Sequence, residues 1–410
     1  MKKFFALLLS LAMVLALVAC GQKDPTPDTP DTPDDPQTKV EYKVAMITDY
    51  GDITDQSFNQ TTYEACKAFA EDNSIEFSYF KPAGDNTADR VAMIEKAVDE
   101  GFNVIVMPGY AFGGAIVEAA PEFPDVKFIA LDVAAGDLLE TAVAKAGEAY
   151  DYTPENWDLN KYVDMSNVYC AVYQEELCGY MAGYAAVKLG YKNLGFLGGM
   201  SVPAVVRYGY GFVQGVDAAA ADLGLTDVKL NYIYGGQFFG DADITAVMDT
   251  WYQGGTEVVF ACGGGIYTSA VDAAKKVGAK VIGVDVDQAG VIANYAGVDG
   301  MTVTSAMKGL YPATYDTLTD VIVNGNWEKY VGKIETLGLV SGTDPEANYV
   351  QIPMGDGTQW SDSFTQDDYK AMVKDMFDGK ITVSNNTSSD VSAASFATVI
   401  TVDDQGSIKG

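Results

Sequence analysis

Polar or glycine-rich segments follow several apolar runs of this sequence, and they contain residue types that bind small polar molecules. The first segment runs from Asp49 to Asn59, where acids, amides and hydroxyls surround Phe58. Later candidates follow other apolar runs: Asp132, Gly263–Gly265, Asp285 and Lys308. Carboxylates accept hydrogen bonds from hydroxyls, and charge-assisted bonds are roughly twice as strong as neutral ones. Glycines let backbone approach a ligand closely. These residues therefore predict recognition of hydroxyl and amide groups beside an aromatic ring.

Histidine is absent from the chain. Its absence removes the commonest general base, the commonest metal ligand and every Ser–His or Cys–His nucleophile pair. Carboxylate or lysine chemistry stays possible. We expect a binding protein without catalytic residues, metal or cofactor.

The net charge of −31 indicates which partners to exclude. Nucleic-acid phosphates would be repelled rather than neutralised by such a chain. A neutral ligand is compatible with this charge, and we expect the acidic residues to form a solvated surface. The sequence predicts no nucleic-acid partner.

Four cysteines lie among apolar residues of the chain body: Cys66, Cys170, Cys178 and Cys262. None of them has the C-x-x-C spacing of a zinc or redox site. Buried free thiols are the expected state. A disulfide stays possible in an exported protein.

Short apolar runs alternate with longer helical patterns from about Val40 onward, which predicts parallel sheets covered by helices on both faces. The candidate strands are Tyr42–Thr48, Phe77–Tyr79, Val104–Met107, Phe128–Asp132, Val168–Tyr173, Gly195–Leu197, Leu230–Tyr234, Val258–Cys262, Val281–Asp285 and Met301–Ser305. About 370 residues exceed one ordinary core, so we expect two lobes. The polar stretch Ala134–Asn167 is long for a loop and marks a lobe boundary that can hold a helix. Ligands of such sheets lie outside the carboxyl ends of strands, where the polar segments fall.

The N-terminal residues predict the compartment. Lys2 and Lys3 precede an apolar run over Phe4–Val18, which is the pattern of a signal peptide and is short for a membrane span. A small residue before Cys20 resembles the bacterial lipobox, which implies removal of residues 1–19 and lipidation of Cys20. The Pro-, Asp- and Thr-rich residues 20–40 read as a tether. We expect a lipid anchor at the extracytoplasmic face of a bacterial cell membrane.

The D-x-G-x-x-x-D-x-S-F-N spacing of Asp49–Asn59 resembles the opening motif of the basic membrane protein family, whose best-understood branch is the PnrA type of purine nucleoside receptor. Later blocks match in order: Phe128–Asp132, Gly263–Gly265, Ile282–Gln288 and Thr304–Lys308. The similarity covers roughly Val44 to Pro312. It implies a type I periplasmic-binding-protein fold, in which two lobes joined by a multi-strand hinge hold nucleoside in the cleft.

The resemblance also implies roles for single residues. Phe58 matches the aromatic that stacks on the base, and Tyr208 falls where the second lobe supplies the opposite ring. Asn59 and Asp132 match groups at the base edge, although Asn59 could instead cap the following helix. The other candidates are Asp49, in the opening motif, and the positions around the ribose, Gly264, Asp285 and Lys308.

The predicted N-terminal lobe comprises residues 41–170 with about 302–325, and the C-terminal lobe residues 171–301 with about 326–410. The implied function is the solute-binding component of an ABC uptake system, with a permease and an ATPase as partners. Val286 departs from the family pattern, where relatives often carry a basic residue, so the base preference stays open.

Three alternatives remain at this point. One is a receptor for a sugar or another small polar solute on the same fold. The second is a nucleoside-processing enzyme using Asp285, Asp287 and Lys308. The third is a surface antigen with no role in transport.

Overall fold

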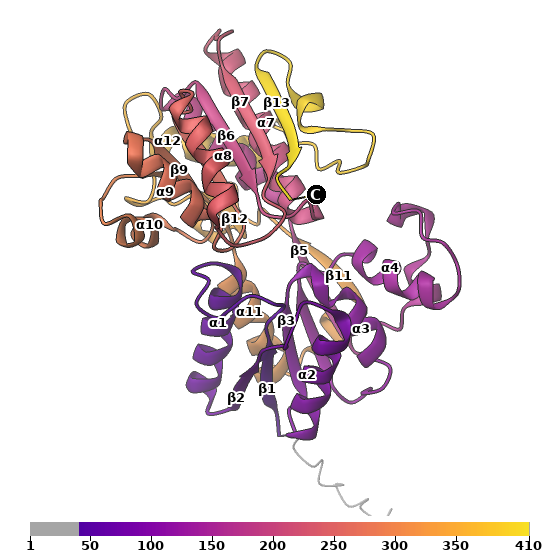
Figure 1. Cartoon of the computed structure of the whole chain (residues 1–410). Coiled ribbons are helices and arrows are strands. Elements are labelled where there is room, and N and C mark those ends of the chain that lie inside the picture. The colour runs from indigo at the N-terminus through magenta and orange to yellow at the C-terminus, as the bar shows by residue number, and fades with distance from the viewer. Residues whose placement is uncertain (1–40, 410) are drawn as a thin grey trace, which may run out of the picture. The chain divides into compact units, whose positions relative to one another are not determined.

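A computed structural model describes residues 41–409. The predicted signal peptide, Cys20 and the tether lie outside the described residues. From Tyr42 onward the chain forms one unit with two sheets, seen as a lower and an upper lobe in Figure 1.

The first sheet is entirely parallel, in the order β11-β5-β4-β3-β1-β2. Its strands are β1 (Lys43–Ile47), β2 (Glu76–Phe80), β3 (Val104–Pro108), β4 (Lys127–Leu131), β5 (Val168–Tyr173) and β11 (Lys333–Leu337). Every residue of β3 and β5 is buried, because helices cover both faces of the sheet. Its helices are α1 (Phe58–Asn73), α2 (Thr87–Asp99), α3 (Gly113–Ala119), α4 (Ala135–Lys145), the short α5 (Leu159–Tyr162) and α11 (Leu310–Leu318).

The second sheet has the order β12-β10-β9-β8-β6-β7-β13, and only β12 is antiparallel to its neighbour. Its strands are β6 (Asn193–Gly198), β7 (Lys229–Tyr234), β8 (Val258–Cys262), β9 (Lys280–Asp285), β10 (Thr302–Lys308), β12 (Val350–Gln351) and β13 (Thr401–Ser407). Its helices are α6 (Glu175–Lys188), α7 (Pro203–Asp222), α8 (Ala242–Gln253), α9 (Tyr267–Val277), α10 (Ala289–Ala296) and α12 (Gln366–Phe377). The sheets therefore bring the carboxyl ends of β4, β8 and β9 toward the junction of the lobes, where the polar segments begin.

Between residues 41 and 409 the chain passes from one sheet to the other three times, after β5, after β10 and after β11. Backbone hydrogen bonds link the three crossings to one another. Gln174 N–H donates to Leu337 O (3.0 Å), Tyr349 N–H to Gly338 O (3.0 Å) and Gly309 N–H to Tyr349 O (2.7 Å). The hinge is thus a connected set of three segments.

The observed sheets differ from the expected lobe boundaries. Residues 302–308 form β10 of the second sheet, where Ala306 and Met307 pair with Val284 and Asp285 of β9, although they were expected in the N-terminal lobe. Residues 333–337, expected in the C-terminal lobe, pair with β5 in the first sheet. Residues 168–173 also belong to the first sheet, so the second set of strands begins after them. The order of the strands along the chain does not determine the sheet, because β10 pairs with β9 and β12 of the second sheet whereas the later β11 pairs with β5 of the first.

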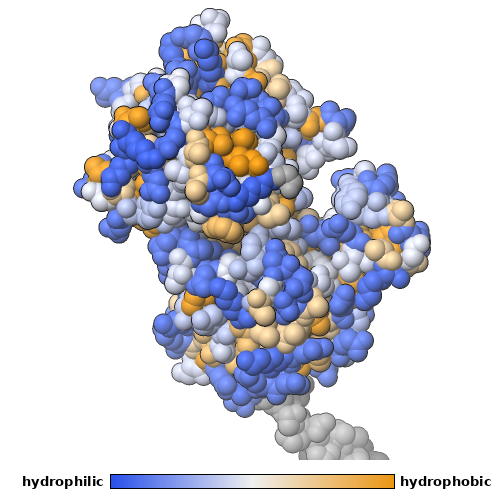
Figure 2. Space-filling model, viewed as in Figure 1, coloured by the Kyte–Doolittle hydropathy of each residue, from blue (hydrophilic) through white to orange (hydrophobic). Residues whose placement is uncertain are grey.

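The surface agrees with the acidic composition. Hydrophilic residues cover most of the face in Figure 2, and apolar residues show in small separate patches. No helix between residues 41 and 409 has the length and apolar character that a membrane crossing requires. Cys66, Cys170, Cys178 and Cys262 are buried free thiols, as expected.

Candidate ligand-binding site

A pocket at the junction of the two lobes is lined by residues of both. It brings together all eight predicted ligand residues: Asp49, Phe58, Asn59, Asp132, Tyr208, Gly264, Asp285 and Lys308. Other residues of the wall were not predicted from the sequence: Tyr50, Asp55, Tyr110, Asp137, Arg207 and Phe238.

Lys308, at the end of β10, is the buried cation of the pocket. Its ammonium donates to Asp132 Oδ2 at 2.5 Å and lies 3.1 Å from Glu175 Oε1. It also lies 5.1 to 5.4 Å from the ring centroids of Phe58, Tyr173 and Tyr208, within the range of cation–π attraction. Burial alone lowers the pKa of Lys308, but Asp132 and Glu175 raise it above its ordinary value, so the ammonium stays charged.

Glu175 and Arg207 extend this charged cluster. Glu175 begins α6 with a fully buried side chain, and Arg207 Nε on α7 donates to Glu175 Oε2 at 2.7 Å. Burial raises the pKa of the Glu175 carboxyl, and the opposing attraction of Arg207 and Lys308 brings it below its usual value. The sequence motifs did not reveal Glu175, because its partners come from two distant segments.

Asp132 and Asp285 stand at the ends of β4 and β9 in left-handed backbone, with φ of 59° and 63°. Such conformations are uncommon for residues other than glycine, and clusters of them occur at functional sites. Asp285 accepts from Ser57 Oγ of the first lobe at 2.5 Å and from the Tyr208 hydroxyl at 3.2 Å. Burial raises the pKa of Asp132 to about 6, and Lys308 opposes this shift.

The segment before α1 holds Asn59 in a fixed orientation. Its side-chain amide donates to Asp49 Oδ1 (3.2 Å) and Asp55 Oδ2 (3.1 Å). Asp55, rather than Asn59, accepts from the first backbone amides of α1, at Asn59 N (2.9 Å) and Gln60 N (3.1 Å). Asn59 Oδ1 is therefore left as an acceptor at the pocket; both it and Asp132 Oδ1 are buried without a hydrogen-bond partner among residues 41–409.

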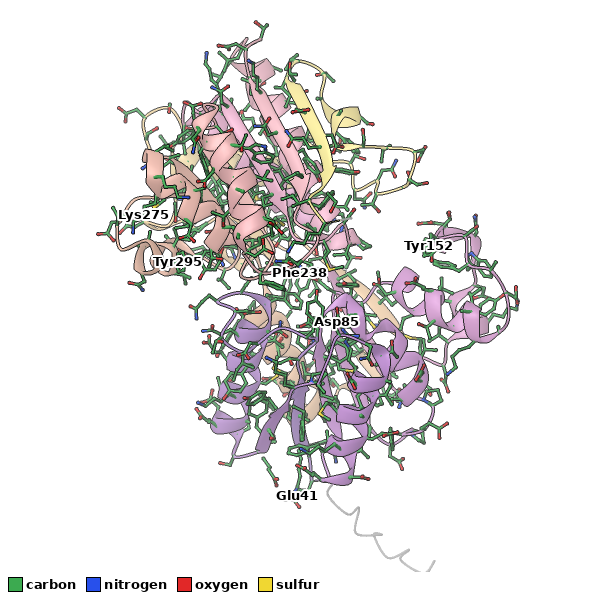
Figure 3. All side chains as sticks on the ribbon, viewed as in Figure 1. Glu41, Asp85, Tyr152, Phe238, Lys275 and Tyr295 are labelled. Atoms are coloured by element: carbon green, nitrogen blue, oxygen red, sulfur yellow. The ribbon has the colours of Figure 1, made fainter. Side chains whose placement is uncertain are left out.

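Two aromatic residues of the second lobe reach the pocket in different ways. Tyr208 is 2% exposed and packs edge-on against Phe260, with ring centroids 6.0 Å apart. Phe238, in the loop after β7, lies at the junction of the lobes (Figure 3) and tilts against Tyr50 of the first lobe at 6.3 Å. Its ring fills the space above Gly199 and Gly263, where a Cβ would lie 2.4 and 2.6 Å from it. These glycines therefore make room for Phe238.

Further contacts join the lobes around the pocket. The hydroxyls of Tyr50 and Tyr110 in the first lobe each donate to Met200 Sδ of the second at 3.6 Å. Gln288 Nε2 donates to the carbonyl of Gln56 at 3.1 Å. The two lobes are thus in direct contact through side chains of both.

Comparisons with known proteins agree with this architecture. The ABC transporter nucleoside-binding protein BmpA of Lactococcus lactis subsp. cremoris (strain MG1363) is 25% identical over 392 residues, covering 92% of this chain and 96% of that relative. Basic membrane protein B of Borreliella burgdorferi (strain ATCC 35210 / DSM 4680 / CIP 102532 / B31) is 26% identical over 322 residues, covering 76% and 83%.

Among solved structures, the crystal structure of ABC transporter system solute-binding proteins from Aeropyrum pernix K1 superimposes with a TM-score of 0.63 at 18% identity, over 85% of this chain and 95% of that one. This likeness confirms the type I periplasmic-binding-protein fold. A family model described as ABC transporter substrate-binding protein PnrA-like matches residues 42–343. The match spans most of the chain, which therefore belongs to the PnrA-like family of ABC transporter substrate-binding proteins and is the solute-binding component of an ABC transport system.

Proposed function

We propose that the pocket binds a purine nucleoside, which the protein delivers to the permease and ATPase of its transport system. The observation that carries this proposal is the pairing of the Phe58 ring with two buried, unpartnered acceptors, Asn59 Oδ1 and Asp132 Oδ1. A base offers a flat face and N–H donors at its edge, so one ring and two such acceptors match it. Stacking is worth about 1–3 kcal/mol per base. The name of the BmpA relative supports the same ligand class.

The ribose hydroxyls would be bound by Asp285 and by Lys308, with Gly264 beside them. Asp285 already accepts two hydrogen bonds, from Ser57 and Tyr208, which orient its carboxylate. Asp49 acts on the ligand indirectly, through Asn59. Its carboxylate accepts a hydrogen bond from the Asn59 side-chain amide and thereby leaves Asn59 Oδ1 free for the ligand. These assignments divide the pocket into a base end and a sugar end.

The opposite face of the base needs a second apolar surface. Tyr208 was expected there, but it is buried and its hydroxyl is engaged by Asp285, so little of its ring face is free. Phe238 is half-buried, lines the same pocket and comes from the same lobe. We assign the second stacking surface to Phe238, and to Tyr208 the orientation of Asp285.

The lipid anchor belongs to the same proposal. We infer that Cys20 carries the lipid and that the protein acts at the extracytoplasmic face of the membrane. Cys20→Ser should move the protein from the membrane fraction to the medium and abolish palmitate labelling. An unchanged membrane fraction would refute the anchor without affecting the ligand assignment.

The ligand is tested on purified protein by isothermal titration calorimetry. The panel of ligands consists of inosine, guanosine, adenosine, uridine, ribose and galactose. In a separate measurement, mass spectrometry identifies the molecules that the protein releases on denaturation. We expect purine nucleosides to bind and the two sugars to fail. Binding of a sugar without any nucleoside would overturn the proposal.

The same nucleoside samples are then analysed for free base. Sustained release of base would indicate a hydrolase instead of a receptor. Recovery of intact nucleoside after prolonged incubation is the expected result.

A further inference from the structure

The last segment of the chain forms β13 in the second lobe, beyond the residues that the family model matches. It pairs in parallel with β7 at the edge of the sheet, from Thr401 beside Lys229 to Ser407 beside Tyr234. In Figure 1 this strand (yellow) runs beside β7. The pairing continues one residue further, where Ile408 N–H donates to Tyr234 O at 2.8 Å.

A buried carboxylate on α7 fastens the start of this segment. Asp217 is 7% exposed, and its Oδ1 accepts from the backbone amides of Thr398 (2.8 Å), Val399 (2.8 Å) and Ile400 (3.2 Å). Its Oδ2 accepts from the Thr398 hydroxyl at 2.6 Å. The path of the segment is therefore fixed before β13 begins.

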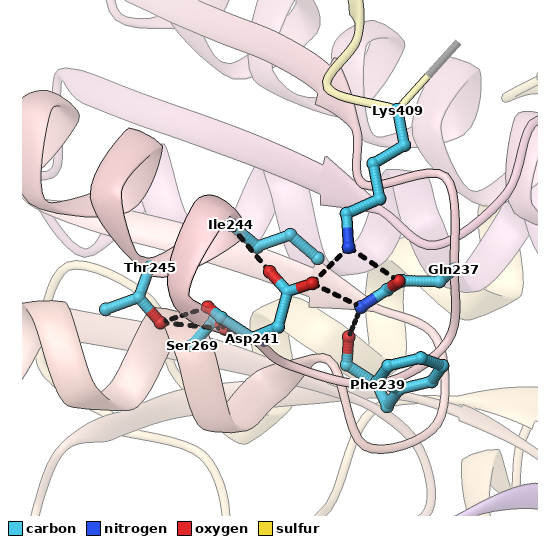
Figure 4. Close-up of polar contacts among 7 residues, drawn as sticks. All are labelled: Gln237, Phe239, Asp241, Ile244, Thr245, Ser269 and Lys409. Atoms are coloured by element: carbon cyan, nitrogen blue, oxygen red, sulfur yellow. Dashed lines mark hydrogen bonds and ion pairs between the residues drawn. The ribbon is translucent and has the colours of Figure 1, made fainter.

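Lys409 fastens the other end to the loop that follows β7. Its ammonium donates to Gln237 Oε1 at 2.8 Å and forms an ion pair with Asp241 (Figure 4). Gln237 Nε2 in turn donates to Asp241 Oδ2 at 3.0 Å and to Phe239 O at 2.9 Å. Asp241 Oδ1 also caps α8, accepting from Ile244 N–H at 3.0 Å. One ammonium thus joins the end of the chain, the loop and the first turn of α8.

The backbone of Lys409 also lies against the loop directly. A Cβ built on Gly236 would lie 2.6 Å from Lys409 O, and Gly236 has a φ of 80° that a side chain would strain. The tail and the loop are therefore packed together through their main chains as well as through the ion pair.

This loop carries Phe238 into the pocket. On its inner side the loop is held by Gly265 N–H, which donates to Phe238 O at 2.9 Å. On its outer side Lys409 is bonded to Gln237, the residue directly before Phe238. The start of the loop is held separately, because Gly235 N–H donates to Gly198 O at 2.7 Å and Gly236 N–H to Gly199 O at 2.9 Å. The outer contact of Lys409 therefore acts mainly on the part of the loop from Gln237 onward.

We propose that Lys409 is a positioning residue for the ligand pocket: by holding Gln237 and Asp241 it fixes the loop Gly235–Gly240 and keeps Phe238 in the wall. The effect of Lys409 on ligand binding rests on the proposed function. The effect of Lys409 on the loop does not depend on which ligand binds. A single ion pair near the surface contributes little to global stability, and this one is partly buried, with side-chain exposures of 35% for Lys409 and 26% for Asp241. The Lys409–Asp241 pair acts locally instead, because a loop can open as a separate unit of low stability while the rest of the protein stays folded.

The test compares Lys409→Met with Lys409→Arg and with Lys276→Met. Lys276 makes a similar ion pair in the same lobe, with Asp249 at 2.7 Å, and it is the matched control. The first readout is amide hydrogen exchange of peptides covering residues 235–241 without added ligand. We expect exchange in Lys409→Met to be about tenfold faster, as for a local opening that has become about 1.4 kcal/mol easier. Lys409→Arg and Lys276→Met should exchange as wild type.

The second readout is the dissociation rate of the nucleoside that wild type binds. We expect a rise of about threefold to tenfold in Lys409→Met, because wall contacts act mainly on dissociation, with an unchanged unfolding temperature. Exchange or dissociation indistinguishable from Lys276→Met would overturn the inference. If wild type binds no nucleoside, the proposed function fails, and exchange of the loop alone decides the role of Lys409.

Discussion

The Lys308 ammonium at the end of β10 donates to Asp132 at the end of β4 at 2.5 Å, so one buried ion pair joins the second lobe to the first across the pocket. Both side chains are at most 10% exposed, and Glu175 lies on the other side of the ammonium. This relationship makes ligand binding and lobe closure depend on the same groups. It also predicts a large effect of removing the cation.

Lys308→Met leaves Asp132 and Glu175 without their shared cation. Breaking a buried pair by removing one partner costs about 3–5 kcal/mol. We expect this loss in the free energy of unfolding measured with urea at pH 7.5. Lys192→Met, which removes a pair with Asp227 between exposed side chains, should cost about 0–1 kcal/mol. Equal losses in the two variants would contradict the proposed importance of the Lys308 cluster.

Phe58→Ala removes the predicted stacking ring. A loss of about 1–3 kcal/mol per base corresponds to an affinity for purine nucleoside about 5- to 150-fold weaker. Calorimetric titration gives this ratio, and Phe58→Tyr should retain most of the affinity. Tyr63→Ala on the same helix removes a ring that packs on Phe77 and Tyr79 away from the pocket, so it should leave affinity unchanged. Normal binding by Phe58→Ala would refute the assignment of Phe58.

Stability should fall as the pH rises toward neutrality because of Glu176. This side chain is 3% exposed, and burial raises the pKa of its carboxyl from 4.5 to about 7, with the nearby Glu175 adding to the shift and Arg207 opposing it. The folded state therefore binds a proton that the unfolded state has already released. The contribution of this bound proton to the free energy of unfolding is fully present below about pH 4.5 and is lost as the pH rises through about 7. Burial acts in the same direction on Asp137, whose pKa it raises to about 7.

Glu176→Gln should flatten the dependence between pH 4.5 and 8 and raise stability at pH 8 by about 1–3 kcal/mol, since one pKa unit corresponds to about 1.4 kcal/mol. Unfolding by urea across this range measures the slope. The exposed Glu95 on α2 offers a matched change, Glu95→Gln, which should leave the slope as in wild type. A slope unaltered by Glu176→Gln would refute this origin of the pH dependence.

Asp217→Ala should free the segment that leads into β13. The three backbone amides that donate to Asp217 would lose their partner, and a hydrogen bond to a charged group contributes about 1.5–3 kcal/mol. We expect faster proteolysis around residues 378–400, detected by mass spectrometry of the fragments. Asp222→Ala on the same helix, which removes an exposed acceptor of the Tyr184 hydroxyl, should be cut as wild type. Equal cutting of the two variants would count against the Asp217 anchor.

Much of the fold followed from periodicity. The apolar run Val104–Met107 is buried along its length within β3, and the predicted strand Val258–Cys262 appears with the same bounds as β8. β13 was not predicted, because its residues are mostly polar and exposed, as an edge strand allows. β11 (Lys333–Leu337) was missed as well, because three of its five residues are exposed.

The pocket residues that could be predicted are those at strand ends and those that match the family motifs. Asp132 and Asp285 follow from the parallel arrangement, because each stands at the carboxyl end of a strand in its own sheet, and both line the pocket between the sheets. Phe238 could not be assigned from the sequence, because its place depends on the glycines of two other loops and on a tail residue far along the chain. Glu175 was hidden for a related reason, since α6 and α7 must pack before Arg207 can reach it.

The three crossings between the lobes, bonded to one another along their backbones, have a mechanical consequence. Two lobes connected by one flexible segment could rotate relative to each other about three axes. Three segments that are hydrogen-bonded to one another suppress twisting of the lobes and leave mainly one bending motion. We therefore expect the lobes to open and close mainly along this one bending coordinate, so that little orientational entropy is lost on closure. Gln174→Pro or Tyr349→Pro would remove one of the backbone hydrogen bonds that link the three crossings. Either substitution should restore the suppressed rotations and slow closure, even though every residue of the pocket is intact.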